Sequence, residues 1–112
     1  MAYTLREALK HRNVKDVRIL VREASFYLGS LQTEIRIRLY IRPEDEQTLY
    51  YETSHHLKTP LHRDRVASGR NYGVSEAEAF HEAMTSLTDP YDDAVMSGHR
   101  PSEDWLVPNR FF

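Results

Sequence analysis

The sequence predicts a single α+β domain: a three-stranded antiparallel sheet packed by a carboxyl-terminal helix, in the order α-β-β-β-α. Three observations lead to this prediction. Three segments with alternating apolar residues follow one another through short connections, which favours an antiparallel meander. An amphipathic helical pattern comes after them. The chain of 112 residues is 40% hydrophobic and 29% charged, which is ordinary for one soluble domain with one modest core.

The first element is predicted to be a short helix over residues 5 to 12. Thr4 and Glu7 have the spacing of a capping box, in which each side chain accepts a hydrogen bond from a free backbone N–H. Leu5 and Leu9 recur at helical spacing. Because a helix of about two turns is marginal alone, we expect it to dock on the rest of the domain.

The first strand is predicted after this helix, and its apolar positions change parity along the way. Odd positions are apolar first: Val17, Ile19 and Val21. Even positions follow: Ala24, Phe26 and Leu28. A slip of one residue exchanges the faces of a strand, so we expect a bulge between Arg22 and Ala24.

The second strand, residues 33 to 42, has the clearest alternation in the chain. Its inner face is predicted to carry Ile35, Ile37, Leu39 and Ile41. Its outer face is predicted to carry Arg36, Arg38, Tyr40 and Arg42. Residues 43 to 47 are expected to turn the chain. Residues 48 to 56 are then expected to form the third strand, with an inner set of Leu49, Tyr51 and Thr53.

The carboxyl-terminal helix is predicted to begin at a second capping box, formed by Ser75 and Glu78. An amphipathic stripe follows at helical spacing: Phe80, Ala83, Met84 and Leu87. Asp89-Pro90 is expected to end this helix and to start a short second one, because aspartate can cap a helix and proline suits its first turn. Gly98 suits the end of that second helix.

The last twelve residues are predicted to be a tail, residues 101–112, docked on a folded core of residues 1–100. Large apolar side chains in a tail usually dock on their own domain or on a partner. We expect Trp105 to pack in cis, and Phe111 and Phe112 to reach outward.

The element order, with a helix entered as GVSEAEAFHEAMTSL, is loosely similar to that of the double-stranded RNA-binding domain over about residues 4 to 88. In that family a glycine-serine segment leads into an alanine-bearing second helix, whose first lysines hold phosphates. The resemblance implies the topology. This sequence departs from the family pattern where the lysines stand, because it has Glu76, Glu78 and Glu82 there. The topology carries over and the phosphate contacts do not.

Residues 55 to 70 allow three interpretations. A metal site would draw on His55, His56 and His62, with Asp64 or His81 as a further donor. Neighbouring strand residues point to opposite faces, however, and these spacings are not standard for zinc. A phosphate clamp would use Lys58, Arg63, Arg65 and Arg70. The third interpretation is a solvated connection without a ligand.

The outer face of the second strand offers a nucleic-acid interface through Arg36 and Arg38, with Tyr40 as a stacking group. Alternatively, these arginines form ion pairs with Glu34, Glu52 or the acids of the helix. The balance of charge is uneven: residues 1–70 hold 13 Lys/Arg and 9 Asp/Glu, and the remaining residues hold 2 and 8. Such segregation makes a bipolar surface if the fold keeps the halves apart.

The sequence favours a non-enzymatic binding module. It holds no cysteine, and no nucleophile elbow, phosphate loop or dinucleotide fingerprint. We expect no catalytic residues, no cofactor and no metal, and a cytoplasmic protein, since no apolar run has the length of a signal peptide or a membrane span. Asp89, Asp92 and Asp93 lack the further ligands of a calcium loop.

The leading hypothesis is a protein-interaction module, an accessory or phage-type regulator or inhibitor that binds a protein partner or a second copy. The phage assignment rests on small size and the lack of a housekeeping motif. The contact residues are predicted in the acidic carboxyl-terminal third and its tail: Glu76, Glu78, Asp92, Asp93, Trp105, Phe111 and Phe112. The alternative is a nucleic-acid binder that uses the basic strand face and the following loop: Arg36, Arg38, Lys58, Arg63, Arg65 and Arg70.

Overall fold

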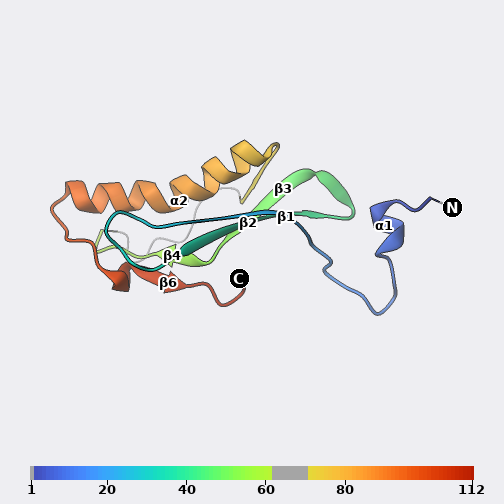
Figure 1. Cartoon of the computed structure of the whole chain (residues 1–112), viewed down its shortest axis with the longest axis horizontal. Coiled ribbons are helices and arrows are strands. Elements are labelled where there is room, and N and C mark those ends of the chain that lie inside the picture. Colours follow the sequence, from blue (N-terminus) through green and yellow to red (C-terminus); the bar gives the residue numbers. More distant parts are fainter. Residues whose placement is uncertain (1, 62–70) are drawn as a thin grey trace.

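The computed structural model describes residues 2–61 and 71–112 and shows a long helix lying along one face of a sheet (Figure 1). The main sheet has four strands in the order β1 (Ile19–Phe26), β2 (Ile35–Arg42), β3 (Asp45–Thr53) and β5 (Tyr72–Gly73), and all neighbours are antiparallel. The helix is α2 (Glu76–Met96). The predicted α+β class, with an antiparallel sheet packed by a carboxyl-terminal helix, is confirmed. The sheet gains one short strand, β5.

The core lies between β2 and α2. Three alternate residues of β2 are 0% exposed: Ile35, Ile37 and Leu39. The predicted facing of the second strand is therefore confirmed for these three residues, whereas Ile41 is only half-buried. These side chains meet buried residues spaced one turn apart on α2: Ala79, Ala83 and Leu87. Two residues of the predicted inner set of β3 pack against one of these clusters: Leu49 and Tyr51.

The first strand contains the predicted irregularity, slightly earlier than expected. The register between β1 and β2 shifts between Leu20 and Arg22, so the bulge precedes the predicted segment. Leu20 pairs with Tyr40, and Arg22 pairs with Leu39. Paired residues in a ladder point to the same face. The bulge therefore places Leu20 on the face away from α2 and Arg22 on the helix side.

Two predicted bounds around the third strand are wrong. Its turn is short, Pro43–Glu44, and β3 already begins at Asp45. The strand ends at Thr53, and the two histidines that follow belong to a separate strand, β4 (His55–Leu57). A two-residue connection suffices for an antiparallel hairpin, so the acidic residues after the turn can join the ladder.

Ser54 explains why the chain leaves the main sheet. The Ser54 N–H donates to the carbonyl oxygen of Arg36 at 2.8 Å, as in a regular ladder. The Arg36 N–H, however, donates to the Ser54 hydroxyl at 2.8 Å instead of to the Ser54 carbonyl oxygen. The Ser54 carbonyl is thereby available to accept the N–H of Asn109 at 2.8 Å. β4 then pairs with β6 (Leu106–Pro108) as a second, two-stranded sheet.

The helix α2 begins at the predicted cap, where the Ser75 hydroxyl accepts the Glu78 N–H at 3.1 Å. The predicted end at Asp89-Pro90 is wrong, and so is the separate second helix, because α2 continues to Met96 with Pro90 inside it. An interior proline costs about 3 kcal/mol or more. The buried stripe runs unbroken past it and outweighs that cost: Ala79, Ala83, Leu87, Pro90 and Ala94.

The first helix, α1 (Leu5–Ala8), is shorter than predicted, although the Thr4 hydroxyl does accept the Glu7 N–H at 3.1 Å. None of its residues is buried, so the expected docking is absent. It lies at one end of a molecule that measures 61 × 26 × 24 Å (Figure 1). Among residues 2–61 and 71–112, no helix combines the length and the apolar character needed to cross a membrane.

The tail docks on its own domain through Trp105, as expected. A 3-10 turn, η1 (Glu103–Trp105), leads into β6 and leaves Trp105 only 6% exposed. Its ring meets the ring of Tyr91 edge to face, with centroids 6.0 Å apart. Glu103 fastens the turn to the loop between β1 and β2, where it accepts from the backbone N–H of Gln32 and, at 2.7 Å, from the hydroxyl of Thr33.

Candidate functional site on the open face of the sheet

The face of the main sheet that points away from α2 collects arginine, tyrosine and glutamate side chains. They come from alternate positions of neighbouring strands, which the antiparallel register places side by side. We call this surface the open face, defined by Arg18, Leu20, Glu23, Arg36, Arg38, Tyr40, Arg42, Tyr50, Glu52 and Tyr72. Sequence reasoning identified the arginines of β2, Tyr40 and, as a partner for the arginines, Glu52, but missed the other residues that neighbouring strands contribute.

Glu23 joins the two predicted arginines of β2 into one cluster. Its carboxylate accepts from Arg36 at 3.2 Å and from Arg38 at 3.3 Å. The expected partners were Glu34, Glu52 and the acids of the helix, and that expectation is wrong for these two arginines. Glu52 instead pairs with Arg18 at 2.6 Å. All these side chains are between 23% and 42% exposed, so the pairs are only partly desolvated.

A row of tyrosines crosses the open face beside these ion pairs. The rings of Tyr40 and Tyr50 are stacked with centroids 5.6 Å apart, and Tyr72 lies 6.1 Å from Tyr50. The guanidinium carbons of Arg18 and Arg42 lie 4.9 Å and 5.5 Å from the rings of Tyr40 and Tyr50. Tyr40 is 7% exposed, so its ring faces are already covered by neighbours.

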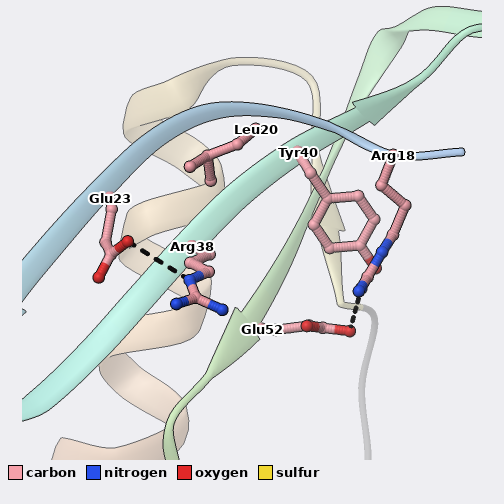
Figure 2. Close-up of a pocket in the computed structure, with 6 residues that line it drawn as sticks. All are labelled: Arg18, Leu20, Glu23, Arg38, Tyr40 and Glu52. Atoms are coloured by element: carbon pink, nitrogen blue, oxygen red, sulfur yellow. Dashed lines mark hydrogen bonds and ion pairs between the residues drawn. The ribbon is translucent and has the colours of Figure 1, made fainter. Parts of the chain in front are cut away.

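A shallow pocket of about 240 Å³ opens at the centre of this face (Figure 2). Its lining combines two cations, two anions, a phenol and an aliphatic side chain: Arg18, Arg38, Glu23, Glu52, Tyr40 and Leu20. Leu20 is 57% exposed and supplies the apolar part. The hydrogen bond with Tyr40 and the attraction to Glu52 outweigh partial burial and raise the pKa of Arg18 above its usual value. Arg18 therefore stays charged.

The tail crosses the open face at Phe112, contrary to the expectation that both terminal phenylalanines reach outward. The ring centroid of Phe112 lies 3.9 Å from the guanidinium carbon of Arg38 and 5.1 Å from that of Arg36. Arg38 also donates to the main-chain oxygen of Phe112 at 3.2 Å. Phe111 does point outward and is 84% exposed.

The predicted acidic contact residues are dispersed over the fold. Glu76 and Glu78 lie in the first turn of α2, and Glu76 forms an ion pair with Arg22. Asp92 and Asp93 lie near the other end, about 20 Å away at 1.5 Å per residue. The remaining three belong to the tail, with Trp105 in the core. The structure does not bring these residues together.

Most of the predicted basic loop lies outside the described residues: His62, Arg63, Asp64, Arg65 and Arg70. Lys58 is described, with an exposed side chain and a backbone N–H that donates to the carbonyl oxygen of Trp105 at 2.8 Å. Because the other basic residues of the predicted phosphate clamp lie outside the described residues, the clamp stays a prediction.

Three histidines of the predicted metal site are described, His55 and His56 on β4 and His81 on α2, and they do not form a ligand cluster. His55 lies 2.8 Å through its Nδ1 from the Ser54 hydroxyl, whereas His56 is exposed on the next position of β4. Burial, followed by the charges of Arg36 and His56, lowers the pKa of His55 below its usual 6.5. Within residues 2–61 and 71–112, no three or more histidine, aspartate or glutamate side chains gather as metal ligands.

Tyr50, which sequence reasoning missed, had a readable signal. Like Glu52, it alternates with the inner residues of β3, so parity assigns it to the face that carries Arg38. Glu23 had no such signal, because the bulge decides which face it takes. No protein-family model, no curated protein sequence and no solved structure matches this chain.

Proposed function

We propose that this chain is a non-enzymatic protein-binding module and that the open face is its contact surface. The observation that carries the proposal is the gathering of arginine and tyrosine side chains around the shallow pocket, on the face that α2 leaves uncovered. Arginine and tyrosine are enriched at the energetic centres of protein interfaces. The expected acidic third is a weaker candidate, because its residues lie at opposite ends of α2 and in the core.

The chemistry of the pocket fits a protein partner. The pocket presents both signs of charge in alternating pairs, Arg18 with Glu52 and Arg38 with Glu23. A partner surface with both signs can match this pattern, which gives specificity and orientation more than raw affinity. Leu20 and the tyrosine edges add apolar area that such an interface would exclude from water.

The second candidate is single-stranded nucleic acid, which the four arginines and three tyrosines of the open face favour. Phosphate contacts would have to compete with the carboxylates of Glu23 and Glu52. Base stacking needs an open ring face, whereas Tyr40 is stacked on Tyr50 and is 7% exposed. We therefore rank this candidate below a protein partner.

Site-specific photo-crosslinking in the native cells distinguishes the surfaces. A benzophenone amino acid replaces Leu20 in the pocket, and in a second variant it replaces Met96 at the end of α2, beside the acidic residues. Both side chains are exposed, at 57% and 86%. We expect a nuclease-resistant protein adduct from position 20 and none from position 96.

Two other crosslinking results would contradict the proposal, each in a different way. An adduct from position 96 alone would return the contact surface to the acidic third and overturn the proposal. A nuclease-sensitive adduct from position 20 would favour the second candidate. That result can be checked by retention on mixed oligonucleotides at about 50 mM salt, where phosphate contacts are strong.

A further inference from the structure

The arginine pair of β2 forms a cradle that is already shaped for an aromatic ring. Glu23 holds Arg36 and Arg38 through one oxygen each, so the two guanidinium groups are fixed side by side. Neighbouring guanidinium groups repel each other, and the shared carboxylate of Glu23 offsets that repulsion. The cradle consists of Glu23, Arg36 and Arg38. Its cations are 42% and 31% exposed and can contact a further group.

Phe112 occupies this cradle through two kinds of contact. Its ring lies over both guanidinium groups, closest to Arg38 at 3.9 Å, which is the geometry of a cation–π interaction. Its main-chain oxygen accepts from Arg38 at 3.2 Å. The residue thus satisfies Arg38 with an aromatic face and an acceptor oxygen at the same time. These are groups that any protein segment with an exposed phenylalanine or tyrosine can present.

The segment that delivers Phe112 is anchored just before it. The side-chain amide of Asn109 donates to the carbonyl oxygen of Thr53 at 3.0 Å, and its oxygen accepts the N–H of Phe111 at 3.0 Å. Beyond Asn109, the turn closed by the Phe112 N–H on the Asn109 carbonyl oxygen and the contacts of Phe112 with the cradle hold the chain among the described residues. Each partly exposed cation–π contact favours the docked over the undocked tail by about two- to fivefold. The hydrogen bond adds to these contacts, and the conformational entropy lost on ordering the terminal residue opposes them, so we expect docking of Phe112 to be favoured by about tenfold.

We infer that the cradle is a recognition site for an aromatic side chain of the protein partner, and that Phe112 covers it in cis until the partner displaces it. The inference rests on the proposed function and deepens it, because it names the chemistry of the contact: an aromatic ring whose own main-chain oxygen accepts from Arg38. Because the partner must displace Phe112, its apparent affinity for the cradle is reduced by the factor that favours the docked tail, about tenfold.

The first test follows the Arg38 side chain by NMR. A phenyl ring over a guanidinium shifts the Arg38 Nε–H resonance by its ring current, so Phe112→Leu should move that resonance. Phe111→Leu, the matched change at the neighbouring exposed phenylalanine, should leave it in place. Equal spectra for wild type and Phe112→Leu would show that the ring does not cover the cradle, and would overturn the inference.

The second test opens the cradle and supplies a ligand in trans. The probe is a peptide of residues 107–112, blocked at both ends and titrated into the full chain. We expect Phe112→Ala to bind it about tenfold more tightly than wild type or Phe111→Ala. The gain should disappear when Arg38→Gln is added, and a peptide with leucine in place of its last phenylalanine should bind more weakly. Equal binding of the phenylalanine and leucine peptides, or no gain for Phe112→Ala, would refute aromatic recognition.

Failure of the inference and failure of the proposed function give different results. If the cradle rejects the peptide while position 20 still forms its protein adduct, only the aromatic site is wrong. If position 20 gives no adduct while the peptide binds the opened cradle, the pocket is not the contact surface.

Discussion

Replacing Trp105 by alanine tests whether the tail is part of the folded domain. Trp105 is 6% exposed and meets Tyr91 edge to face. Removing a buried aromatic side chain costs about 3–5 kcal/mol, because apolar contacts are lost and a cavity remains. For a domain of this size each kcal/mol lowers the melting temperature by about 4 °C. We therefore expect Trp105→Ala to melt about 12–20 °C below wild type.

Thermal and guanidinium unfolding followed by far-UV circular dichroism measure this loss. Phe111→Ala is the control in the same tail, because its side chain is 84% exposed and its removal should change stability by less than about 0.5 kcal/mol. A double-mutant cycle with Tyr91→Ala isolates the ring contact, for which we expect a coupling of about 0.5–1.5 kcal/mol. Trp105 is the one tryptophan of the chain, so wild-type emission should be that of a buried indole.

The opposite pattern would refute the packing. If Trp105→Ala and Phe111→Ala are equally stable and the cycle shows no coupling, the indole does not lie against Tyr91. A solvent-exposed emission spectrum in the wild-type protein would lead to the same conclusion.

Three further substitutions test other contacts. Gly73→Ala should lower the free energy of unfolding by about 1–3 kcal/mol, because its Cβ would lie 2.7 Å from the backbone nitrogen of Ala79; unchanged denaturation would contradict that approach of β5 to α2. Hydrogen bonds from the Gln32 N–H and then Thr33 lower the pKa of Glu103 below 4.5, so its stabilisation exists above that pH and is lost as pH falls through the folded value. The free energy of unfolding of Glu103→Gln should be lower than that of wild type at neutral pH, and the two values should converge in acid. A difference that does not depend on pH would contradict this role of the Glu103 carboxylate. The pKa of His55 is also lowered, first of all by burial, so the neutral ring contributes stability that is present above pH 6.5 and is lost as pH falls through the folded pKa. His55→Gln should therefore flatten the fall of the free energy of unfolding with pH in this range, measured by urea denaturation. An unchanged slope would show that His55 does not cause that fall.

The parts of the fold that the sequence predicts are those with a local signal. The alternation in β2 is unambiguous because aliphatic residues and arginines take opposite parities, and the cap at Ser75 depends only on residues within one turn. Pro90 misleads because local propensity ends the helix there. The buried stripe that carries α2 onward depends on a sheet that is distant in sequence.

The candidate site was predicted only in part for a similar reason. Strand parity alone places Arg36, Arg38 and Tyr40 on one face. The partner of the two arginines depends on the bulge in β1, and the ring that covers them comes from the far end of the chain. No pattern in neighbouring residues encodes that Glu23 or Phe112 will lie there.

The exit of the chain at Ser54 has a consequence for the order of folding. The hairpin of β2 and β3 closes through a two-residue turn, whereas β4 finds β6 only across the whole of α2. Loop-closure entropy favours the short connection first, so we expect the hairpin in the folding nucleus and the small sheet to form last. Substitutions in β6 should then speed unfolding and leave the folding rate nearly unchanged. A newly assembled sheet therefore presents Arg38 to its surroundings before its own tail arrives.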